Sequence, residues 1–274
     1  MRWAAATLLL TSLAGTTSAQ GGPENPLPDA VQRPSATEQT QVIEKARTIA
    51  LEYTGNLPNF VATETVRRQF LSKGARTWKA EDTLLVDVAF VEGDERYTLL
   101  TINGKPTRKT LDSLDGVNFG GEFGSFLLGV FQLKAEAKFK WERWTTLQGR
   151  PAHVFSYHIE KDRSGFSMYF DTGHKGSLPF GGLVYVDRET HQVLRFTSEA
   201  EIPADWPATG MTGELDYGFA EVDGKPFLLP LHAEMRIHWR AGAQSRSVTE
   251  FGNYHKFSTG VTITAINPSS VDEE

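Results

Sequence analysis

The 274-residue sequence contains no cysteine. Disulfides, thiolate metal sites and thiol catalysis are therefore excluded, and so is a lipid anchor attached to a cysteine at a signal-peptide cleavage site. Three motifs of common enzymes are missing as well: the Gly-x-Ser-x-Gly of hydrolases, the His-Glu-x-x-His of metalloproteases and the Gly-Lys-[Ser/Thr] of phosphate loops. On these grounds no catalytic residue, no metal ligand and no cofactor is predicted.

The sequence also lacks a hydrophobic run of the roughly 20 residues that a membrane-spanning helix needs. Its N-terminus instead has a positive Arg2, a short apolar stretch over residues 4–14 and a small-residue site that ends at Ala19. This pattern predicts a signal peptide over residues 1–19, with an N-terminal membrane anchor as the alternative. We therefore expect a periplasmic or extracellular protein without a stable membrane anchor.

The sequence has fewer basic residues than acidic ones, 28 lysines and arginines against 34 aspartates and glutamates. The formal net charge is −6, and removal of residues 1–19 takes away Arg2 and leaves −6 − 1 = −7. A mildly acidic chain is a poor partner for nucleic acid or for an anionic membrane surface. Neither is expected as a partner.

The remaining chain is predicted to form one domain over residues 37–266. Residues 20–36 are rich in proline and glycine and predict a disordered linker, while residues 267–274 predict a flexible tail. Ser35-x-x-Glu38 is a capping-box pattern that opens a helix, and the helix is expected to end near Thr54-Gly55. Its apolar residues recur at helical spacing, at Val42, Ile43, Ala46, Ile49, Ala50 and Tyr53.

From Asn59 onward the apolar period changes to two, which indicates β-strands. About ten or eleven strands follow, most of them joined by hairpin-length turns such as Asn103-Gly104, and residues 231–239 alternate without exception. The fold class predicted is mainly β (α+β): a large curved antiparallel sheet, or half-barrel, wrapped around the N-terminal helix and a short central helix. A closed lipocalin-like barrel and a β-sandwich are the alternatives.

The central helix is predicted within residues 120–131, where Phe123, Phe126, Leu127, Val130 and Phe131 recur at helix-like intervals. Its glycines each lower helix propensity by about 1 kcal/mol relative to alanine, so the helix needs tertiary packing to form. It is either a plain core helix or a movable plug that lines an apolar cavity.

Glu122 stands beside this apolar run and has two interpretations. It either caps the helix or is buried with a raised pKa, in which case Arg67 or Arg68 is the partner it needs. His232-x-Glu234 puts an imidazole and a carboxylate on one strand face. That pair is interpreted as a solvated outer face, with a metal site as the alternative.

The order of elements resembles the LolA/LolB group of periplasmic lipoprotein-sorting carriers and their RseB/MucB-type relatives, over residues 37–266. Locally, residues 53–68, the turn Ile102-Asn-Gly-Lys-Pro106 and Gly121-Glu-Phe-Gly-Ser125 resemble secreted bacterial proteins without assigned function. Carriers of this group hold acyl chains between a concave sheet and its helices. The resemblance therefore implies a ligand site formed by Phe123, Phe126, Leu127, Val130, Phe131, Trp141, Phe155 and Tyr157.

The function expected is that of a non-catalytic binding protein, a monomer whose partner is a hydrophobic or lipidic ligand or a lipoprotein. Two alternatives stay open. One is an envelope protein–protein interaction module with a filled core. The other is an unrecognised secreted hydrolase, which would need two carboxyl groups about 5–10 Å apart in a polar cleft.

Overall fold

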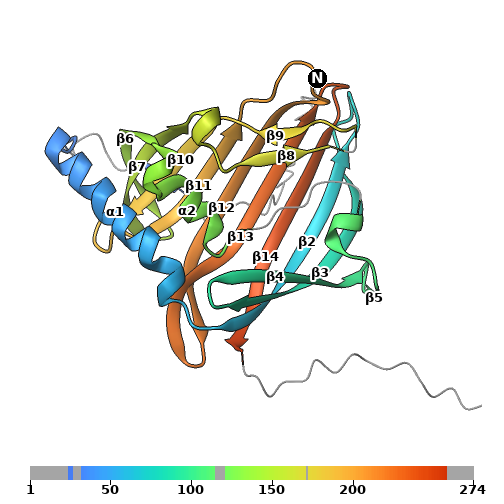
Figure 1. Cartoon of the computed structure of the whole chain (residues 1–274), viewed down its shortest axis with the longest axis horizontal. Helices are drawn as coiled ribbons and strands as arrows, with labels where there is room; N and C mark the ends of the chain where they lie inside the picture. Colours follow the sequence, from blue (N-terminus) through green and yellow to red (C-terminus); the bar gives the residue numbers. More distant parts are fainter. Residues whose placement is uncertain (1–23, 27–31, 115–120, 171, 258–274) are drawn as a thin grey trace, which may run out of the picture.

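The computed structural model describes residues 24–26, 32–114, 121–170 and 172–257. Most of these residues belong to one twelve-stranded antiparallel sheet (Figure 1). In spatial order its strands are β1 (Glu24–Pro26), β6 (Lys138–Leu147), β7 (Arg150–Ile159), β10 (Phe180–Asp187), β11 (Val193–Ala200), β12 (Ala208–Val222), β13 (Lys225–Trp239), β14 (Gln244–Lys256), β2 (Phe60–Leu71), β3 (Lys79–Val91), β4 (Asp94–Ile102) and β5 (Lys105–Pro106).

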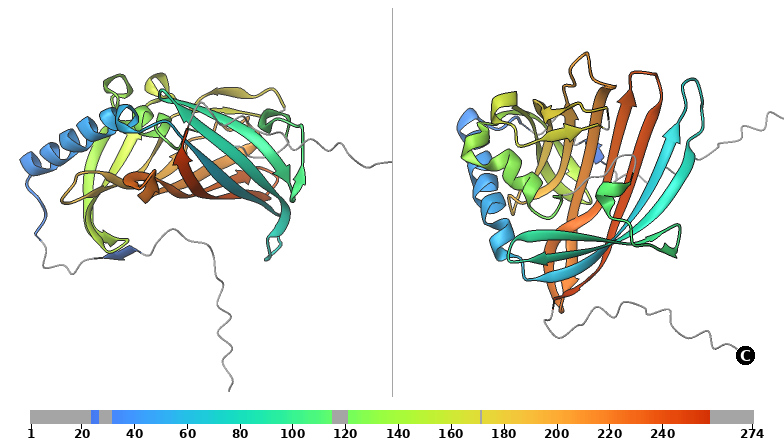
Figure 2. Two further views of the ribbon diagram at one scale, coloured as in Figure 1. Left: turned by 90° about the horizontal axis from the view of Figure 1, so that it is seen from below. Right: turned by 45° about the vertical axis from the view of Figure 1, so that its right-hand side comes forward.

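The sheet is an open, strongly curved half-barrel, which confirms the predicted fold class (Figure 2). Its order runs from β1 at one edge to β5 at the other, with no pairing between these two edges among the described residues. Neighbouring strands are mostly joined by hairpins, but β14 pairs with β2, so the last long strand lies beside the first. A closed barrel and a sandwich are therefore not formed by the part of the chain described.

The two faces of the sheet differ in what covers them. We call concave the face on which α1 (Ala36–Asn56), α2 (Ser125–Phe131) and the two-stranded ribbon of β8 (Ser167–Tyr169) and β9 (Lys175–Ser177) lie, and convex the opposite face (Figures 1 and 2). Three short 3₁₀ turns complete the elements: η1 (Leu111–Ser113), η2 (Leu133–Ala135) and η3 (Lys161–Arg163).

Strand alternation sets the concave face as predicted. Every second residue of β3 from Leu84 to Phe90 is buried, and the intervening residues are half-buried. The predicted alternation of β13 fails at Leu231, which a β-bulge leaves without a partner. Its side chain fills the space that a Cβ on Gly218 would occupy, since such an atom would lie 2.3 Å from Leu231 Cδ1.

The N-terminal helix α1 begins as its sequence predicts and ends slightly later. The Ser35 hydroxyl accepts a hydrogen bond from the Glu38 amide at 3.2 Å, which is the expected N-cap. Gly55 lies inside the last turn instead of terminating the helix, and the C-cap is Leu57 in an extended conformation. The residue before a proline avoids helical geometry, so Pro58 sets this end. None of the described helices is long and apolar enough to cross a membrane.

The predicted segments at the two ends of the chain overlap the described residues only in part. Glu24–Pro26, within the range predicted as a disordered linker, pairs with β6 as strand β1. The predicted signal peptide over residues 1–19 and the predicted tail over residues 267–274 lie outside the described residues.

Candidate functional site

The apolar residues of α2 lie against the concave face, as the predicted central helix requires. Leu127, Val130 and Phe131 are buried, and so is Phe123 just before the helix, whereas Phe126 is half-buried. The helix is only seven residues long, and its N-cap, Gly124, makes no side-chain capping hydrogen bond. Such a short helix is held in place by its packing.

Three phenylalanines of this segment contact three different parts of the sheet. Phe123 meets Phe60 on β2 with ring centroids 5.4 Å apart. Phe126 meets Phe196 on β11 at 5.1 Å, and Phe131 stacks on Phe139 of β6 at 5.5 Å. The segment therefore bridges the curved sheet from β2 to β6.

The predicted sheet aromatics are divided between two clusters. Tyr157 lies beside Phe196, with ring centroids 5.9 Å apart, and so belongs to the cluster around Phe126. Trp141 packs against Trp144 and lies beneath the Arg33 guanidinium, which is 5.4 Å from its ring centroid.

Phe155 is buried beside His153 on β7, with ring centroids 6.0 Å apart. Trp141, in contrast, lies beside the residues that precede α1, because its neighbour Arg33 comes just before that helix. A ligand-binding role for the eight predicted residues stays a prediction.

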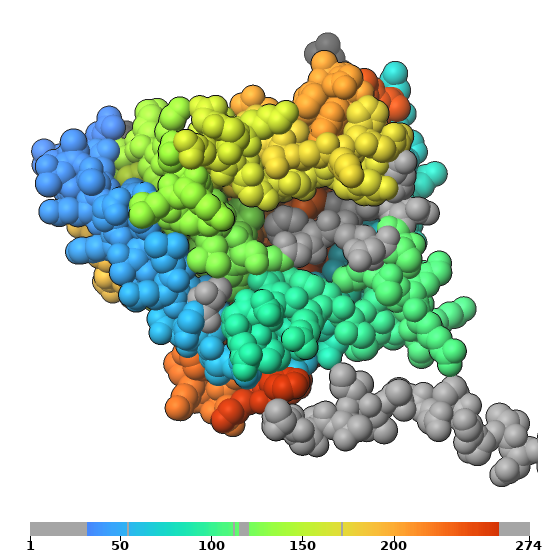
Figure 3. All heavy atoms as spheres, viewed as in Figure 1, coloured from blue at the N-terminus to red at the C-terminus, as the bar shows by residue number. Residues whose placement is uncertain are grey.

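A small pocket adjoins Phe126. Its volume is about 10 Å³, enough for about one water molecule. Phe196 on β11, Leu215 on β12 and Met235 on β13 are among its other lining residues. Figure 3 shows a hollow in the surface between the β8–β9 ribbon and β4. The pocket beside Phe126 is thus much smaller than an acyl chain in this conformation.

Two hydrogen bonds to backbone carbonyls fasten the segment at its ends. The Arg47 guanidinium on α1 donates to the Phe131 carbonyl at 2.9 Å. At the other end, the Tyr217 hydroxyl on β12 donates to the Glu122 carbonyl at 2.8 Å. Both contacts hold the backbone and leave the apolar side chains of α2 to determine the rest of the packing.

The start of the segment is also fastened to β4, through acidic groups. The Tyr97 hydroxyl contacts the carboxyl groups of both Glu95 and Glu122 and accepts a hydrogen bond from the Gly121 amide at 2.9 Å. Glu95 in turn accepts backbone hydrogen bonds from Phe123 and from Ser125. Strand β4, at the curled edge of the sheet, therefore holds the residues that precede α2.

A third carboxyl group lies behind this contact. Glu64 is on the concave face of β2, is 3% exposed, and its Oε1 has no hydrogen-bond partner. Burial and the negative charges of Glu122 and Glu95 raise its pKa to about 9. Burial likewise raises the pKa of Glu122 to about 8. Both groups are therefore protonated at neutral pH in this conformation.

The capping interpretation of Glu122 is thus wrong, and the buried interpretation is correct with different partners. Arg68 pairs with Asp82, the Nη2–Oδ2 distance being 2.6 Å, and the neighbours of Glu122 are Tyr97 and Glu95. Sequence reasoning missed Glu64, although its even spacing from Phe60 places it on the same face of the strand.

The convex face carries carboxylates that are paired with arginines. Arg195 forms a two-pronged contact with Asp216, whose Nη2–Oδ2 distance is 2.7 Å, and it also lies 3.3 Å from Glu214. Arg246 contacts Glu234 at 2.5 Å. These pairs join neighbouring strands across the outside of the half-barrel.

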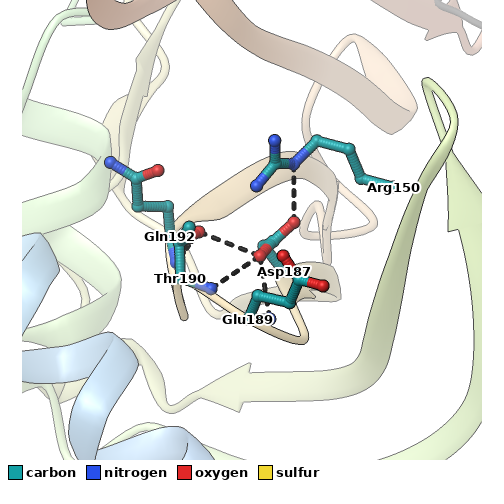
Figure 4. A network of polar contacts seen from close by, with 5 residues as sticks. All are labelled: Arg150, Asp187, Glu189, Thr190 and Gln192. Carbon is teal, nitrogen blue, oxygen red and sulfur yellow. Dashed lines mark hydrogen bonds and ion pairs between the residues drawn. The ribbon is translucent and has the colours of Figure 1, made fainter.

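Asp187 is a further example, at the end of β10 (Figure 4). Arg150 Nε donates to it at 2.7 Å, and the amides of Glu189 and Thr190 donate at 2.9 and 2.7 Å. Burial alone would raise its pKa, but these donors outweigh burial and lower the pKa. The carboxylate therefore closes the turn to β11 in its ionised form.

His232 was expected on a solvated outer face with Glu234. The structure corrects the exposure: His232 is 8% exposed, and its Nδ1 lies 3.2 Å from Glu250 rather than joining Glu234. Within the described part of the chain, no group of three or more His, Asp or Glu side chains is arranged to hold a metal ion.

The sequence matches no family model and no curated protein. Solved structures similar to it include a LolA superfamily protein from Nitrosomonas europaea, with 11% identity over 80% of this chain and 93% of that chain at a TM-score of 0.34. Another is a domain from Vibrio parahaemolyticus named for outer membrane lipoprotein sorting, with 16% identity over 82% and 97% at 0.41.

A third is the lipoprotein LppX from Mycobacterium tuberculosis, with 11% identity over 80% of this chain and 97% of that chain at a TM-score of 0.27. The predicted resemblance to the LolA/LolB group is thus confirmed to the extent that a protein of that superfamily is among the similar structures.

Proposed function

We propose that this chain is a non-catalytic binding protein that holds an acyl chain or another amphipathic ligand on its concave face. The observation that carries the proposal is α2 itself: a seven-residue helix whose apolar residues cover the concave face and whose half-buried Phe126 borders a pocket. In this proposal α2 is a plug, and its displacement gives the ligand the apolar surface that α2 now covers.

The energetics of such an exchange are favourable for a long apolar chain. Burial of each methylene contributes about 0.8 kcal/mol, so a fatty chain can replace the contacts that the plug gives up. The proposal includes a monomer that acts in the periplasm or outside the cell after signal-peptide cleavage. A lipoprotein is a second possible source of the acyl chain.

A second candidate is an envelope protein–protein interaction module with a filled core. The contacts of Phe123, Phe126 and Phe131 with the sheet aromatics favour it. In that case α2 stays in place and the outer surface binds the partner. The hydrolase alternative receives no such support, because Glu64 and Glu122 are buried beneath α2 and do not line an open cleft.

Native mass spectrometry of the mature protein from its own envelope, followed by organic extraction, separates the two candidates. A reproducible adduct that extracts as lipid supports the carrier. Uptake of a fluorescent fatty-acid probe supports it as well. A clean apo mass together with no uptake of the probe supports the interaction module.

Variants of α2 then locate the site. Phe126→Asp and Leu127→Asp are expected to abolish binding of the probe while circular dichroism still reports the sheet. Leu133→Asp is the matched control, because Leu133 lies two residues after the end of α2, at the start of η2, and is 74% exposed. Wild-type affinity in a folded Phe126→Asp/Leu127→Asp double variant would exclude α2 as the ligand site.

A further inference from the structure

The Tyr97 hydroxyl has three hydrogen-bond partners, but it can donate only one hydrogen. It accepts from the Gly121 amide at 2.9 Å and contacts both the Glu95 and the Glu122 carboxyl groups, the latter at 3.2 Å. A hydroxyl carries one hydrogen and two lone pairs. All three contacts are satisfied only if one of the two carboxyl groups is protonated, so that Tyr97 donates to one of them and accepts from the other.

The choice of Glu122 as the protonated partner follows from the other contacts of Glu95. Burial raises the pKa of Glu95, but Glu95 also accepts backbone hydrogen bonds from Phe123 and from Ser125, and these donors favour its ionised form and oppose the effect of burial. Glu122 is 1% exposed, and its carboxyl group has one backbone donor, its own amide, where Glu95 has two. The geometry therefore places one proton between Tyr97 and Glu122.

Glu64 supplies an independent indication. Its side chain is almost fully buried, its Oε1 has no hydrogen-bond partner, and it interacts with Glu122 and Glu95. An ionised oxygen in that position would have neither water nor a donor to stabilise it. Burial of the same oxygen in a neutral carboxylic acid costs far less free energy, so the position of Glu64 also favours its protonated form.

The titratable groups that face these carboxyl groups are one further glutamate and four tyrosines, which come from four elements. Burial is the largest cause that raises the pKa of each of these tyrosines, and interactions with neighbouring tyrosine and glutamate side chains raise it further. The set comprises Tyr53 on α1, Glu95 and Tyr97 on β4, Tyr217 on β12 and Tyr254 on β14. No member of this set is a cation, so an additional negative charge here has no opposite charge in the set to stabilise it.

We propose that Glu64 and Glu122 form a proton-operated latch: while both carry protons the start of α2 stays fixed to β4, and loss of a proton releases α2 from the concave face. The proposal deepens the proposed function and rests on it, because it makes proton binding the control of the plug. Release exposes Glu122 to water, where its charge is hydrated.

The pH window follows from the pKa values in the two conformations. With α2 in place the pKa of Glu122 is about 8 and that of Glu64 about 9, whereas an exposed glutamate has its ordinary value of 4.5. Between these values the released form binds fewer protons, so higher pH favours it. The opening equilibrium rises about tenfold per pH unit for each proton lost, or roughly 100-fold from pH 5.5 to 7.5 for one proton.

Hydrogen exchange of the ligand-free full chain tests this directly. Exchange of peptides that cover residues 121–131 is measured at pH 5.5, 6.5 and 7.5, and the intrinsic pH dependence of amide exchange is divided out. We expect protection of these peptides to fall by about 100-fold over this range, while peptides from β7 keep theirs. Unchanged protection of residues 121–131 across the range would overturn the latch.

Variants assign the effect to the two glutamates. Glu64→Gln and Glu122→Gln are each expected to reduce the pH dependence, and the double variant to remove it. Glu160→Gln is the control, because this glutamate is exposed and lies on the sheet surface next to Lys138. Full wild-type pH dependence in the folded double variant would also overturn the proposal.

Two further arms keep the outcome decisive. If Glu122→Gln does not fold, Tyr97→Phe removes the shared hydroxyl instead and is expected to lower the protection of residues 121–131 already at pH 5.5. Binding of a neutral naphthylamine dye is measured in parallel at pH 5.5 and 7.5. pH-dependent opening without dye binding would keep the latch and reject the acyl-chain carrier, whereas dye binding with pH-independent opening would do the reverse.

Discussion

The two faces of the half-barrel hold their buried carboxyl groups in opposite ways. On the convex face Asp187 and Asp216 are buried, and each is paired with an arginine. On the concave face Glu64 and Glu122 are as deeply buried, and their neighbours are another glutamate and tyrosines. Burial is equal on the two faces, but the charge of the surroundings is not.

This difference indicates two roles: the carboxylates of the convex face stabilise the structure, whereas those of the concave face can gain or lose a proton. Arginine keeps its charge at any physiological pH, so the pairs of the convex face are permanent and join strands. The concave groups sit where only a proton can neutralise them, and the proton is exchanged with solvent. Buried ionisable groups with strongly shifted pKa values are typical of functional sites. The comparison therefore directs attention to the face that α2 covers.

The largest effect is expected from a substitution that breaks an ion pair on the convex face. Asp216→Ala should lower the free energy of unfolding by about 3–5 kcal/mol, because it removes the two-pronged partner of the buried Arg195 guanidinium. Urea denaturation at pH 7 measures the loss. Asp223→Ala is the control, since Asp223 is exposed and lies 3.7 Å from an exposed lysine. A loss below that of the control would show that the convex pairs are not structural.

The next effect concerns the concave carboxyl groups. Their pKa values are raised from 4.5 to about 8 and about 9, so their stabilising contribution is complete below pH 4.5 and is lost as pH rises toward these values. For one proton this loss is about 1.4 kcal/mol of unfolding free energy per pH unit, or about 3 kcal/mol between pH 5.5 and pH 7.5. Denaturation series of the wild type and of Glu64→Gln measure it. Parallel pH profiles would contradict the assignment.

A smaller and opposite effect comes from His153, which is buried beside Trp144 with ring centroids 4.1 Å apart. Burial and the nearby Arg188 lower its pKa from 6.5 to about 4. Its contribution is therefore present above pH 6.5 and lost as pH falls toward 4, by about 1–2 kcal/mol at pH 5. NMR titration of the His153 ring reads the pKa directly. A midpoint at or above 6.5 would reject the prediction.

The smallest effect is expected where charges meet in solvent. Lys138→Ala removes an exposed contact with Glu160, and we expect no resolvable change in Tm. Thermal unfolding followed by circular dichroism at low and high salt checks this. A clear loss would show that surface pairs matter here, which would weaken the contrast between the two faces.

Local pattern was sufficient to predict much of the fold. The alternation of β3 and the helical spacing of α1 are properties of neighbouring residues, so the sequence displays them directly. Ser35 fixed the start of α1 for the same reason. The helix end was displaced to Leu57 because Pro58, and not Gly55, decides where the backbone leaves helical geometry.

The site was predicted only in its apolar half. The residues of α2 were identified because their spacing and their hydrophobicity coincide. The acidic half depends on three segments, at Glu64, Glu95 and Glu122, that meet only in the folded sheet. The spacing of residues within a single segment does not indicate that these three glutamates lie close together in the fold. Trp141 shows the same limit, since its neighbour Arg33 precedes α1.

The pairing of β2 with β14 has a consequence for how the chain reaches this shape. Phe60 lies opposite Lys256, so the centre of the sheet joins residues from the two ends of the domain. Contacts of such long sequence separation form late and slowly. The half-barrel cannot be completed until its last strand has been synthesised.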